Sequence, residues 1–491
     1  MADIEYEKPL AVHETGIPGL KLLDVCVHGD ARGWFKENYQ RAKMRELGIP
    51  DMHVVQNNIS FNADAGVTRG IHAEPWDKFV SVAAGRVFGA WVDVRAGSKT
   101  FGKCFTCTLD PSKAIYVPRG VGNSFQALED GTAYTYLVNA HWSAELKKTY
   151  TFVNLADPAL GIEWPIPLDE AIVSKDDLCH PNLSNVVPMP ARRTLVTGAN
   201  GQVGRAVRAL ADERGIADTF DFTDCDKFDF SDATAYASID WDLYGTVINC
   251  GAYTAVDEAE TSAGRPDCWR TNATGAALLA HTCAEHDLTL VHISTDYVFD
   301  GAVELHTEDE PLSPLGVYGQ SKAAGDLAVA VAPKHYIVRS GWIVGDGRNF
   351  VKTMCELSDK VAAGDMPQLS VVDDQLGRLT FADQAAEAIF WLLGYREGDV
   401  EPSAPCAFGI YNMTGDGAVK SWADIARVCF DAKNGNGDKV VAVSTADYCA
   451  CAKSPVAPRP HHSALDLTKL KASGFFPRNW EKDLERYLSN I

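Results

Sequence analysis

A tyrosine and a lysine four residues apart, Tyr318 and Lys322 in "VYGQSKAAGDL", have the types and spacing of a proton-transfer pair. On a helix, residues at this spacing share one face, so both side chains can reach one ligand atom. A phenol has a pKa of about 10, so it needs a neighbouring cation before its proton is exchanged usefully at neutral pH. Thr295 ends the apolar run "LVHIST" and adds a hydroxyl at the carboxyl end of a predicted strand, where such sheets bind ligands. We therefore predict that these three residues form one catalytic site.

The stretch "TLVTGANGQVG", residues 194–204, predicts a strand that runs through a glycine-rich turn into a helix. Such a turn can approach the pyrophosphate of a dinucleotide, which then meets the free N–H groups of the helix N-terminus. The predicted cofactor-binding residues are Gly198, Asn200, Gly201, Gln202, Val203 and Gly204. The next strand, "DTFDFTD", ends at Asp224, whose carboxylate could hold the adenine ribose, and Asp229 and Phe230 could border the adenine. The two acids could equally be solvated loop residues.

Two different patterns of hydrophobicity surround these motifs. From about residue 53 to 140, short β-type runs are separated by Gly, Pro and Asp, which predicts an all-β sandwich or jelly roll. From residue 193 onward, apolar strands alternate with Ala-rich helices, which predicts a doubly wound parallel sheet of the Rossmann type. The proline-rich segment between them has neither pattern. We expect an all-β domain over 1–180, a linker over 181–192 and an α/β domain over 193–491.

The composition limits the possible partners. The formal net charge is −21 over 491 residues, so the overall field repels nucleic acid and anionic membranes. We find no apolar run of the roughly 20 residues that span a bilayer, and the acidic start "MADIEYEKPL" does not support a secretory signal. Thirteen scattered cysteines suit reduced thiols, so we expect a cytoplasmic protein. Cys104 and Cys107 fall on opposite faces of a predicted strand, and no metal site is expected there.

Several blocks in the second half occur in the order of a known family: "NCGAYTAVDEAE", "TNATGA", "STDYVFDG", "SPLGVYGQSK", "VRSGWIVG", "DDQLGR" and "RPHHSALD". They resemble the dTDP-4-dehydrorhamnose reductases, which are extended short-chain dehydrogenases, across about residues 193–491. The resemblance implies a smaller substrate-binding subdomain and NADPH or NADH as cofactor. It implies that Thr295 hydrogen-bonds a C4 keto oxygen, that Tyr318 protonates the alkoxide, and that Lys322 lowers the tyrosine pKa and holds the nicotinamide ribose. Asp224 favours NADH if it points at the ribose, because a 2′-phosphate would meet a like charge.

The same resemblance suggests a substrate pocket and leaves alternatives open. The pocket candidates are Thr254, Val256, Asp257, Trp342 and Arg459, each of which could instead be ordinary packing or solvated surface. Nucleotide-sugar dehydratases of similar fold place an Asp-Glu pair after the threonine, whereas Asp296 and Tyr297 follow it here, so dehydration is disfavoured. The regulatory subunit of methionine adenosyltransferase resembles these reductases without sharing their role. The intact threonine, tyrosine and lysine set favours an enzyme.

The first half carries a second set of blocks, including "DARGWFKE", "RGIHAEPWDKFV", "AIYVPRGVGNSFQAL", "TYLVNAHW" and "VSKDD". They resemble the dTDP-4-dehydrorhamnose 3,5-epimerases, a family of metal-free cupins, across about residues 15–180. The resemblance implies that His72 is the base, that Asp177 orients it and that Tyr136 returns a proton from the opposite face. It also implies a homodimer formed through this domain. The candidate substrate contacts are Arg32, Asn58, Arg69, Lys78 and Arg119, and of these Arg32, Arg69 and Lys78 would neutralise a diphosphate.

Three positions depart from the epimerase pattern. The segment "HAEPWDK" is short, Asn123 stands where a second histidine is usual, and Trp142 replaces a common tyrosine. These changes bear on the rate and on whether both C3 and C5 invert, but they leave the base, the acid and the carboxylate in place. We predict a fused enzyme that epimerises dTDP-4-dehydro-6-deoxy-glucose and reduces its C4 ketone. The alternatives keep the reductase and make the first domain a single-carbon epimerase or a non-catalytic module for nucleotide-sugar binding or dimerisation.

Overall fold

The computed structural model describes residues 4–396, 405–451 and 455–491 and divides into two compact units, Met1–Ala191 and Arg192–Ile491. Each unit has hydrophobic clusters of its own. Among the described residues, no helix is both long enough and apolar enough to cross a membrane.

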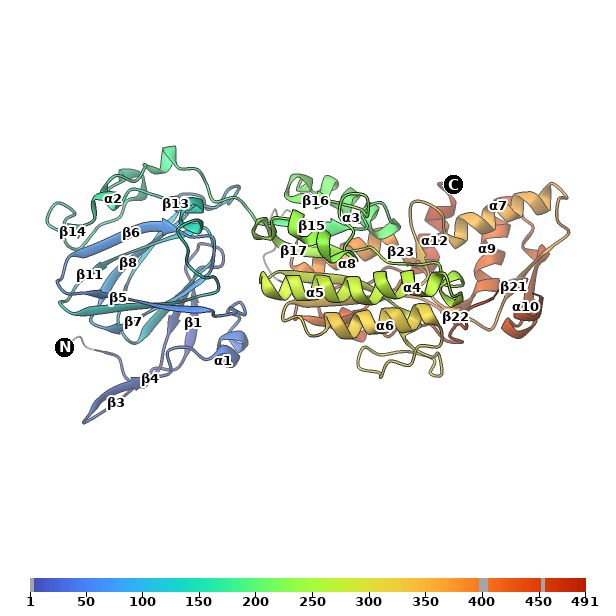
Figure 1. Cartoon of the computed structure of the whole chain (residues 1–491), viewed down its shortest axis with the longest axis horizontal. Helices are drawn as coiled ribbons and strands as arrows, with labels where there is room; N and C mark the ends of the chain where they lie inside the picture. Colours follow the sequence, from blue (N-terminus) through green and yellow to red (C-terminus); the bar gives the residue numbers. More distant parts are fainter. Residues whose placement is uncertain (1–3, 397–404, 452–454) are drawn as a thin grey trace. The chain divides into compact units, whose positions relative to one another are not determined.

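The first unit is a β-sandwich, as the sequence predicted (Figure 1). Its strands are β1 (Ala11–Glu14), β2 (Lys21–Asp24), β3 (Val27–Asp30), β4 (Gly33–Lys36), β5 (Gln56–Asn62), β6 (Val67–Ala73), β7 (Lys78–Ala84), β8 (Val87–Asp93), β9 (Cys104–Leu109), β10 (Lys113–Val117), β11 (Val121–Ala127), β12 (Thr132–Val138), β13 (Thr151–Phe152) and β14 (Ile172–Val173), and its helices are α1 (Arg41–Glu46) and α2 (Lys175–Leu178). One sheet has the order β1-β2-β10-β7-β12-β5 and the other β13-β6-β11-β8-β9, with β14 added to β6. Alternating residues such as Val80, Val82, Trp91 and Tyr134 fill the space between the sheets.

Strands β3 and β4 form a hairpin that projects away from the two sheets of this unit (Figure 1). It exposes Phe35, whose exposed fraction is 65%. Strand β5 lies at the edge of its sheet and exposes Ile59 and Phe61 at 68% and 66%. The unit therefore presents apolar side chains at an open sheet edge and on a projecting hairpin.

Residues 181–191, which we expected to link the domains, belong to the first unit. Met189 is buried, forms a parallel bridge with Arg95, and donates its N–H to the Val94 carbonyl oxygen at 2.8 Å. Leu183 and Val186 pack against the same apolar cluster as Met189. Proline-rich composition without a period does not distinguish a free linker from a chain segment that is laid over a sheet.

The second unit is an α/β fold with a second, smaller lobe. Its strands are β15 (Arg193–Thr197), β16 (Phe220–Phe222), β17 (Tyr244–Asn249), β18 (Thr289–Thr295), β19 (His335–Ser340), β20 (Ile343–Val344), β21 (Leu369–Val372), β22 (Leu376–Gly377), β23 (Thr380–Phe381), β24 (Gly409–Asn412), β25 (Lys420–Ser421) and β26 (Val440–Val443). Its helices are α3 (Gln202–Glu213), α4 (Gly264–Trp269), α5 (Ala276–Glu285), α6 (Val317–Val329), α7 (Phe350–Ala362), α8 (Ala382–Leu393), α9 (Trp422–Asn434), α10 (Thr445–Cys451), α11 (Thr468–Ala472) and α12 (Trp480–Leu488).

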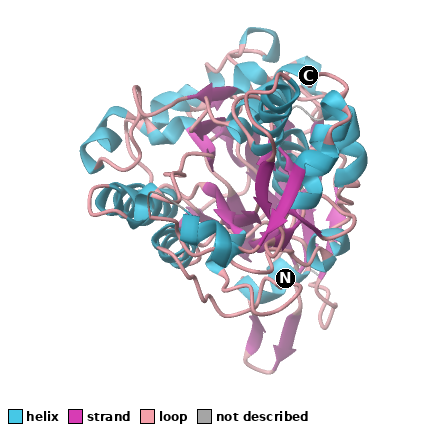
Figure 2. Cartoon of the chain, turned by 90° about the vertical axis from the view of Figure 1, so that its right-hand side faces the viewer, coloured by secondary structure: helices cyan, strands magenta, loops and turns pink. Residues whose placement is uncertain are grey.

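The main sheet of this unit is parallel throughout, in the order β16-β15-β17-β18-β19-β24. Successive strand residues point to opposite faces: Val196 and Ile248 pack under α3 and α8, whereas Leu195 and Val247 pack under α5 and α6. Helices therefore surround the strands (Figure 2), and the strands read as continuous apolar runs because both faces are buried. Helices α7, α9 and α12 form a third core that makes up the smaller lobe.

Candidate active sites

The glycine-rich turn of the second unit is shaped by close backbone contacts. Gly198 has a φ of +63°, and a Cβ there would lie 2.4 Å from the Gly251 nitrogen. A Cβ at Gly204 would lie 2.4 Å from the Gly198 carbonyl oxygen, so α3 packs directly on the turn. Gly201 is the N-cap of α3 and no side chain caps the helix there. The turn and the first-turn N–H groups therefore fit a pyrophosphate.

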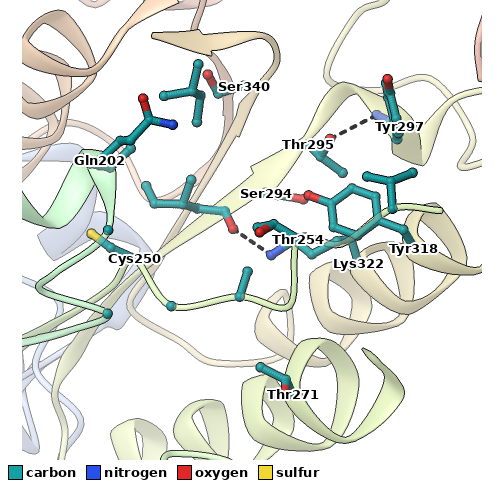
Figure 3. A pocket seen from close by; sticks show the side chains of 18 of the residues that line it. Gln202, Cys250, Thr254, Thr271, Ser294, Thr295, Tyr297, Tyr318, Lys322 and Ser340 are labelled. Atoms are coloured by element: carbon teal, nitrogen blue, oxygen red, sulfur yellow. Dashed lines mark hydrogen bonds between the residues drawn. The ribbon is translucent and has the colours of Figure 1, made fainter. Parts of the chain in front are cut away.

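A cavity of about 860 Å³ opens beside this turn. It is lined by thirteen of the predicted residues: Gly198, Gly201, Gln202, Val203, Asp224, Asp229, Phe230, Thr254, Val256, Thr295, Tyr318, Lys322 and Trp342. Asn200, Gly204, Asp257 and Arg459 are not among its lining residues. Gln202 and Cys250 lie on one side of it and Tyr318 on the other (Figure 3). The cavity thus joins the glycine-rich turn to the predicted proton-transfer residues.

The side chains of Thr295, Tyr318 and Lys322 converge in this cavity (Figure 3). Thr295 is the last residue of β18, and the other two lie in the first turns of α6. Burial raises the pKa of Tyr318, while its hydrogen bond with Thr295 acts in the opposite direction. Lys322 is 1% exposed and donates to the Ile293 carbonyl oxygen at 2.7 Å. Burial lowers the Lys322 pKa to about 8.

Asp296 and Tyr297 follow the threonine where a dehydratase would carry two acids. The Thr295 hydroxyl donates to Asp296 Oδ1 at 2.9 Å and accepts from the Tyr297 N–H at 3.2 Å. Burial raises the pKa of Asp296 to about 6. These two residues therefore orient the threonine, and the second acid of an elimination pair is replaced by a phenol.

The remaining candidates of this unit have identifiable partners. Arg459 forms an ion pair with Asp257 at 2.9 Å, and Asp257 also accepts the Ala457 N–H at 2.9 Å. Asp224 accepts the backbone N–H groups of Asn200 and Cys225 at 3.1 and 2.9 Å. Its carboxylate therefore braces the glycine-rich turn as well as lining the cavity.

An indole pair borders the cavity on the side of the smaller lobe. The rings of Trp342 and Trp422 stack with centroids 3.6 Å apart and planes 17° apart. Trp342 has a φ of +52°, an uncommon backbone conformation for a bulky residue. A Cβ at Gly377 would lie 2.8 Å from the Trp342 ring, so the absence of a side chain there leaves room for the indole.

The first unit has a cavity of about 880 Å³ between its sheets and α2. The predicted residues that line it are Arg69, His72, Lys78, Tyr136 and Asp177, together with Asn123. His72 Nε2 lies 2.9 Å from Asp177 Oδ1, and the Gly70 N–H donates to Asp177 Oδ2 at 3.4 Å. Burial alone would raise the Asp177 pKa, but the hydrogen bonds from His72 and Gly70 lower it overall. The fold thus brings together the His72 imidazole and the Asp177 carboxylate, which are far apart in the sequence.

Lys78 is placed differently from our expectation. It is 4% exposed, forms a 2.8 Å ion pair with Glu74, and lies 5.6 Å from the centroid of the Tyr136 ring. Because the Lys78 ammonium is buried and paired with Glu74, it is not available to neutralise a diphosphate at the surface. Its charge acts on groups inside the cavity instead. Burial, and secondly Glu74, raise the pKa of Tyr136, while Arg69 opposes them.

Three other predicted contacts lie away from this cavity. Arg32 is in the turn of the β3–β4 hairpin, where its exposed side chain pairs with Asp30. Arg119 donates to the Pro190 carbonyl oxygen. Asn58 lines a neighbouring cavity of about 290 Å³, which also contacts Tyr136. The sequence does not indicate where the side chain of an isolated arginine points. The prediction was therefore right about the main cavity only for Arg69 among the predicted arginines of this unit.

His180 is a cavity residue that the sequence analysis missed. Its ring stacks on Phe152 with centroids 4.7 Å apart, and its Nε2 lies 3.9 Å from Asp177 Oδ1. A ring nitrogen of His72, a carboxylate oxygen of Asp177 and a ring nitrogen of His180 all lie within 4.8 Å of one another. We did not anticipate this group of possible metal ligands. The signal available was its position three residues after Asp177 and two residues after the end of a short helix.

Asn123, which replaces the usual second histidine, lies opposite His72 on the adjacent strand. Its Oδ1 accepts from Trp91 Nε1 at 2.8 Å and from the Tyr134 hydroxyl at 2.9 Å. Both donors are buried, so the amide oxygen satisfies groups that would otherwise lack a partner.

Comparison with known proteins extends over both units. The family model of the RmlD substrate binding domain matches residues 192–491, and that of dTDP-4-dehydrorhamnose 3,5-epimerase matches residues 14–185. The protein RmlC homolog of Streptococcus pyogenes serotype M6 is 50% identical over 195 residues, which is 38% of this chain and 98% of that protein. The chain belongs to both families. Its epimerase-family unit contains the cavity around His72, and its reductase-family unit contains the cavity around Tyr318.

Relatives of the reductase-family unit support the same assignment. The dTDP-4-dehydrorhamnose reductase of Aggregatibacter actinomycetemcomitans is 35% identical over 304 residues, which is 60% of this chain and 97% of that protein. A crystal structure of dTDP-4-dehydrorhamnose reductase from Bacillus anthracis in complex with NADP is 29% identical, with a TM-score of 0.51, and the match covers 61% of this chain and 99% of that one. Both resemblances drawn from the sequence are confirmed.

Proposed function

We propose that this chain catalyses two successive steps on one sugar nucleotide. Its first unit epimerises dTDP-4-dehydro-6-deoxy-glucose at C3 and C5, and its second reduces the C4 ketone with NADPH or NADH to give dTDP-L-rhamnose. The observation that carries the proposal is that each unit has a cavity with its own acid–base set, His72 with Asp177 in one and Tyr318 with Lys322 in the other. The names of the relatives of each unit agree with these two reactions.

In the epimerase step, the C4 ketone acidifies the hydrogens on C3 and C5. His72 Nε2 faces Asp177, so the carboxylate holds the proton on that nitrogen and Nδ1 is left as the base. Tyr136 lies on β12 of the other sheet, from which it returns a proton to the opposite face of the carbanion. The buried Lys78 ammonium beside Tyr136 stabilises negative charge on the C4 oxygen.

In the reductase step, the groups around Tyr318 handle the proton that accompanies hydride transfer. A bound nicotinamide supplies the hydride to C4. The Thr295 hydroxyl turns from Asp296 to the C4 oxygen and orients it. Tyr318 donates its proton to that oxygen, and the adjacent Lys322 charge stabilises the phenolate that remains. Asp224 next to the glycine-rich turn disfavours a 2′-phosphate, which favours NADH.

Solvent deuterium tests the epimerase step directly. With the 4-keto sugar and the wild-type chain in D₂O without cofactor, we expect deuterium at both C3 and C5, measured by NMR. Incorporation at one carbon supports the single-carbon epimerase instead. Incorporation at neither carbon, with the chain folded, supports a binding or dimerising module.

We also propose that the chain is a homodimer formed through its first unit. The edge strand β5 exposes Ile59 and Phe61, and an apolar sheet edge is covered in most soluble proteins. Light scattering of the full chain should give a dimer mass, and Ile59→Glu with Phe61→Glu should give a monomer. Phe101→Glu, at an exposed residue of the same unit, serves as the matched control and should stay dimeric. A wild-type monomer would contradict this proposal.

A further inference from the structure

Beneath the Tyr318 cavity, a buried amide has its orientation fixed by the backbone. Asn249 ends β17, and its Oδ1 accepts the Gly251 N–H at 3.0 Å and the Thr197 hydroxyl at 2.8 Å. A backbone N–H only donates, so the atom facing it must be the amide oxygen. The Nδ2 group of Asn249 therefore points to the other neighbour, His292.

This orientation decides which nitrogen of His292 carries a proton. Asn249 Nδ2 lies 3.1 Å from His292 Nδ1, so Nδ1 must accept and has no proton. Burial lowers the His292 pKa well below its ordinary value, so the ring is neutral. Its single proton is on Nε2, which lies 3.1 Å from Lys322 Nζ.

A ring N–H directed at Lys322 requires a lone pair on the lysine nitrogen. An ammonium has three donors and no acceptor, whereas the neutral amine can accept from His292 and still donate to the Ile293 carbonyl oxygen. The other groups near the lysine do not reverse this preference. Asp326, one turn further along α6, is paired with the buried Arg339 at 3.0 Å, and Cys268 on α4 is bonded to the Ser321 hydroxyl.

We propose that Asn249 and His292 are positioning residues that hold Lys322 as a neutral amine until the nicotinamide ribose binds. The inference rests on the proposed reductase function, which uses the lysine as an ammonium. Ribose hydroxyls can accept from an ammonium, so binding at a pH above the Lys322 pKa takes up a proton. The chain thereby avoids burying an unpaired charge in the absence of the cofactor.

The two hydrogen bonds that join Asn249 to His292 and His292 to Lys322 form a relay. The substitution Asn249→Asp reverses the direction in which both hydrogen bonds are donated. The Gly251 N–H and the Thr197 hydroxyl keep the carboxylate ionised by donating to one of its oxygens, and the other oxygen accepts a hydrogen bond from the Nδ1–H of His292. Nε2 of His292 then offers a lone pair, which favours the Lys322 ammonium. The variant should therefore keep the lysine charged to higher pH than the wild type does.

Calorimetry of NADH binding in buffers of different ionisation enthalpy measures the proton uptake directly. At about pH 9, one unit above the Lys322 pKa near 8, the wild type should take up about one proton, and Asn249→Asp far less. The alkaline limb of kcat/KM for hydride transfer should move upward by about one unit in Asn249→Asp. Thr197→Val keeps the Gly251 contact that orients the amide and should match the wild type in both measurements.

The proton uptake of the wild type tests the proposal without any variant. If NADH binding takes up no proton at that pH, the relay is overturned, even if Asn249→Asp fails to fold. Equal proton uptake by the wild type and a folded Asn249→Asp also overturns it. Failure of the proposed function looks different, because the wild type would then oxidise no cofactor with the epimerised ketone whatever its proton uptake.

Discussion

Tyr318→Phe is expected to lower the rate of cofactor oxidation by on the order of 10²- to 10⁴-fold, because the ring keeps its packing but has no proton for the C4 oxygen. Exchange of solvent deuterium into the 4-keto sugar should be unchanged, since it belongs to the cavity around His72. Absorbance of the reduced cofactor measures the first activity, and NMR in D₂O measures the second.

A matched control for this substitution is Tyr244→Phe. Tyr244 is in the same unit, its hydroxyl donates to Asp221 at 3.0 Å, and it does not line the cavity. This variant should retain hydride transfer. If Tyr318→Phe also retains it within a few fold, another group supplies the proton and our assignment of the acid is wrong.

His72→Ala is expected to lose deuterium exchange by a similar order of magnitude, because Asp177 alone cannot reach the basicity of an imidazole. It should also oxidise little cofactor when given the unepimerised sugar. Adding a separate active epimerase should restore oxidation, because the Tyr318 site is intact. His53→Ala, at an exposed residue of the same unit, should behave as the wild type does.

The rescue distinguishes two sites from one. If the added epimerase fails to restore oxidation while His72→Ala still binds NADH and remains folded, then His72 acts on hydride transfer itself. The model of two separable sites would then be wrong.

The sequence was most informative where chemistry depends on local spacing. Tyr318 and Lys322 could be placed on one helix face, and Thr295 at a strand end, because helix period and strand direction are properties of short segments. The pairing of His72 with Asp177 depends on α2 packing against β6, and only the family resemblance joined these two residues.

The burial of charged side chains and the partners of buried amides could not be predicted from short segments of the sequence. The burial of Lys78 depends on Glu74 and on Tyr136 from another strand, so the residue looked like any surface cation. The relay through Asn249 and His292 depends on the register of β15, β17 and β18, which places the groups of three strands in contact. Segment 181–191 packs on its own unit through contacts that its composition does not reveal.

The stacked indoles of Trp342 and Trp422 give the reductase-family unit an optical property of its own. Two aromatic rings this close couple their electronic transitions, so the pair should contribute a split band of opposite signs to the ultraviolet circular dichroism. Because both rings border the Tyr318 cavity, a ligand that shifts either ring changes the splitting. The intact chain therefore carries a label-free reporter of occupancy in its reductase-family site, separate from the long-wavelength band of the reduced nicotinamide that measures turnover.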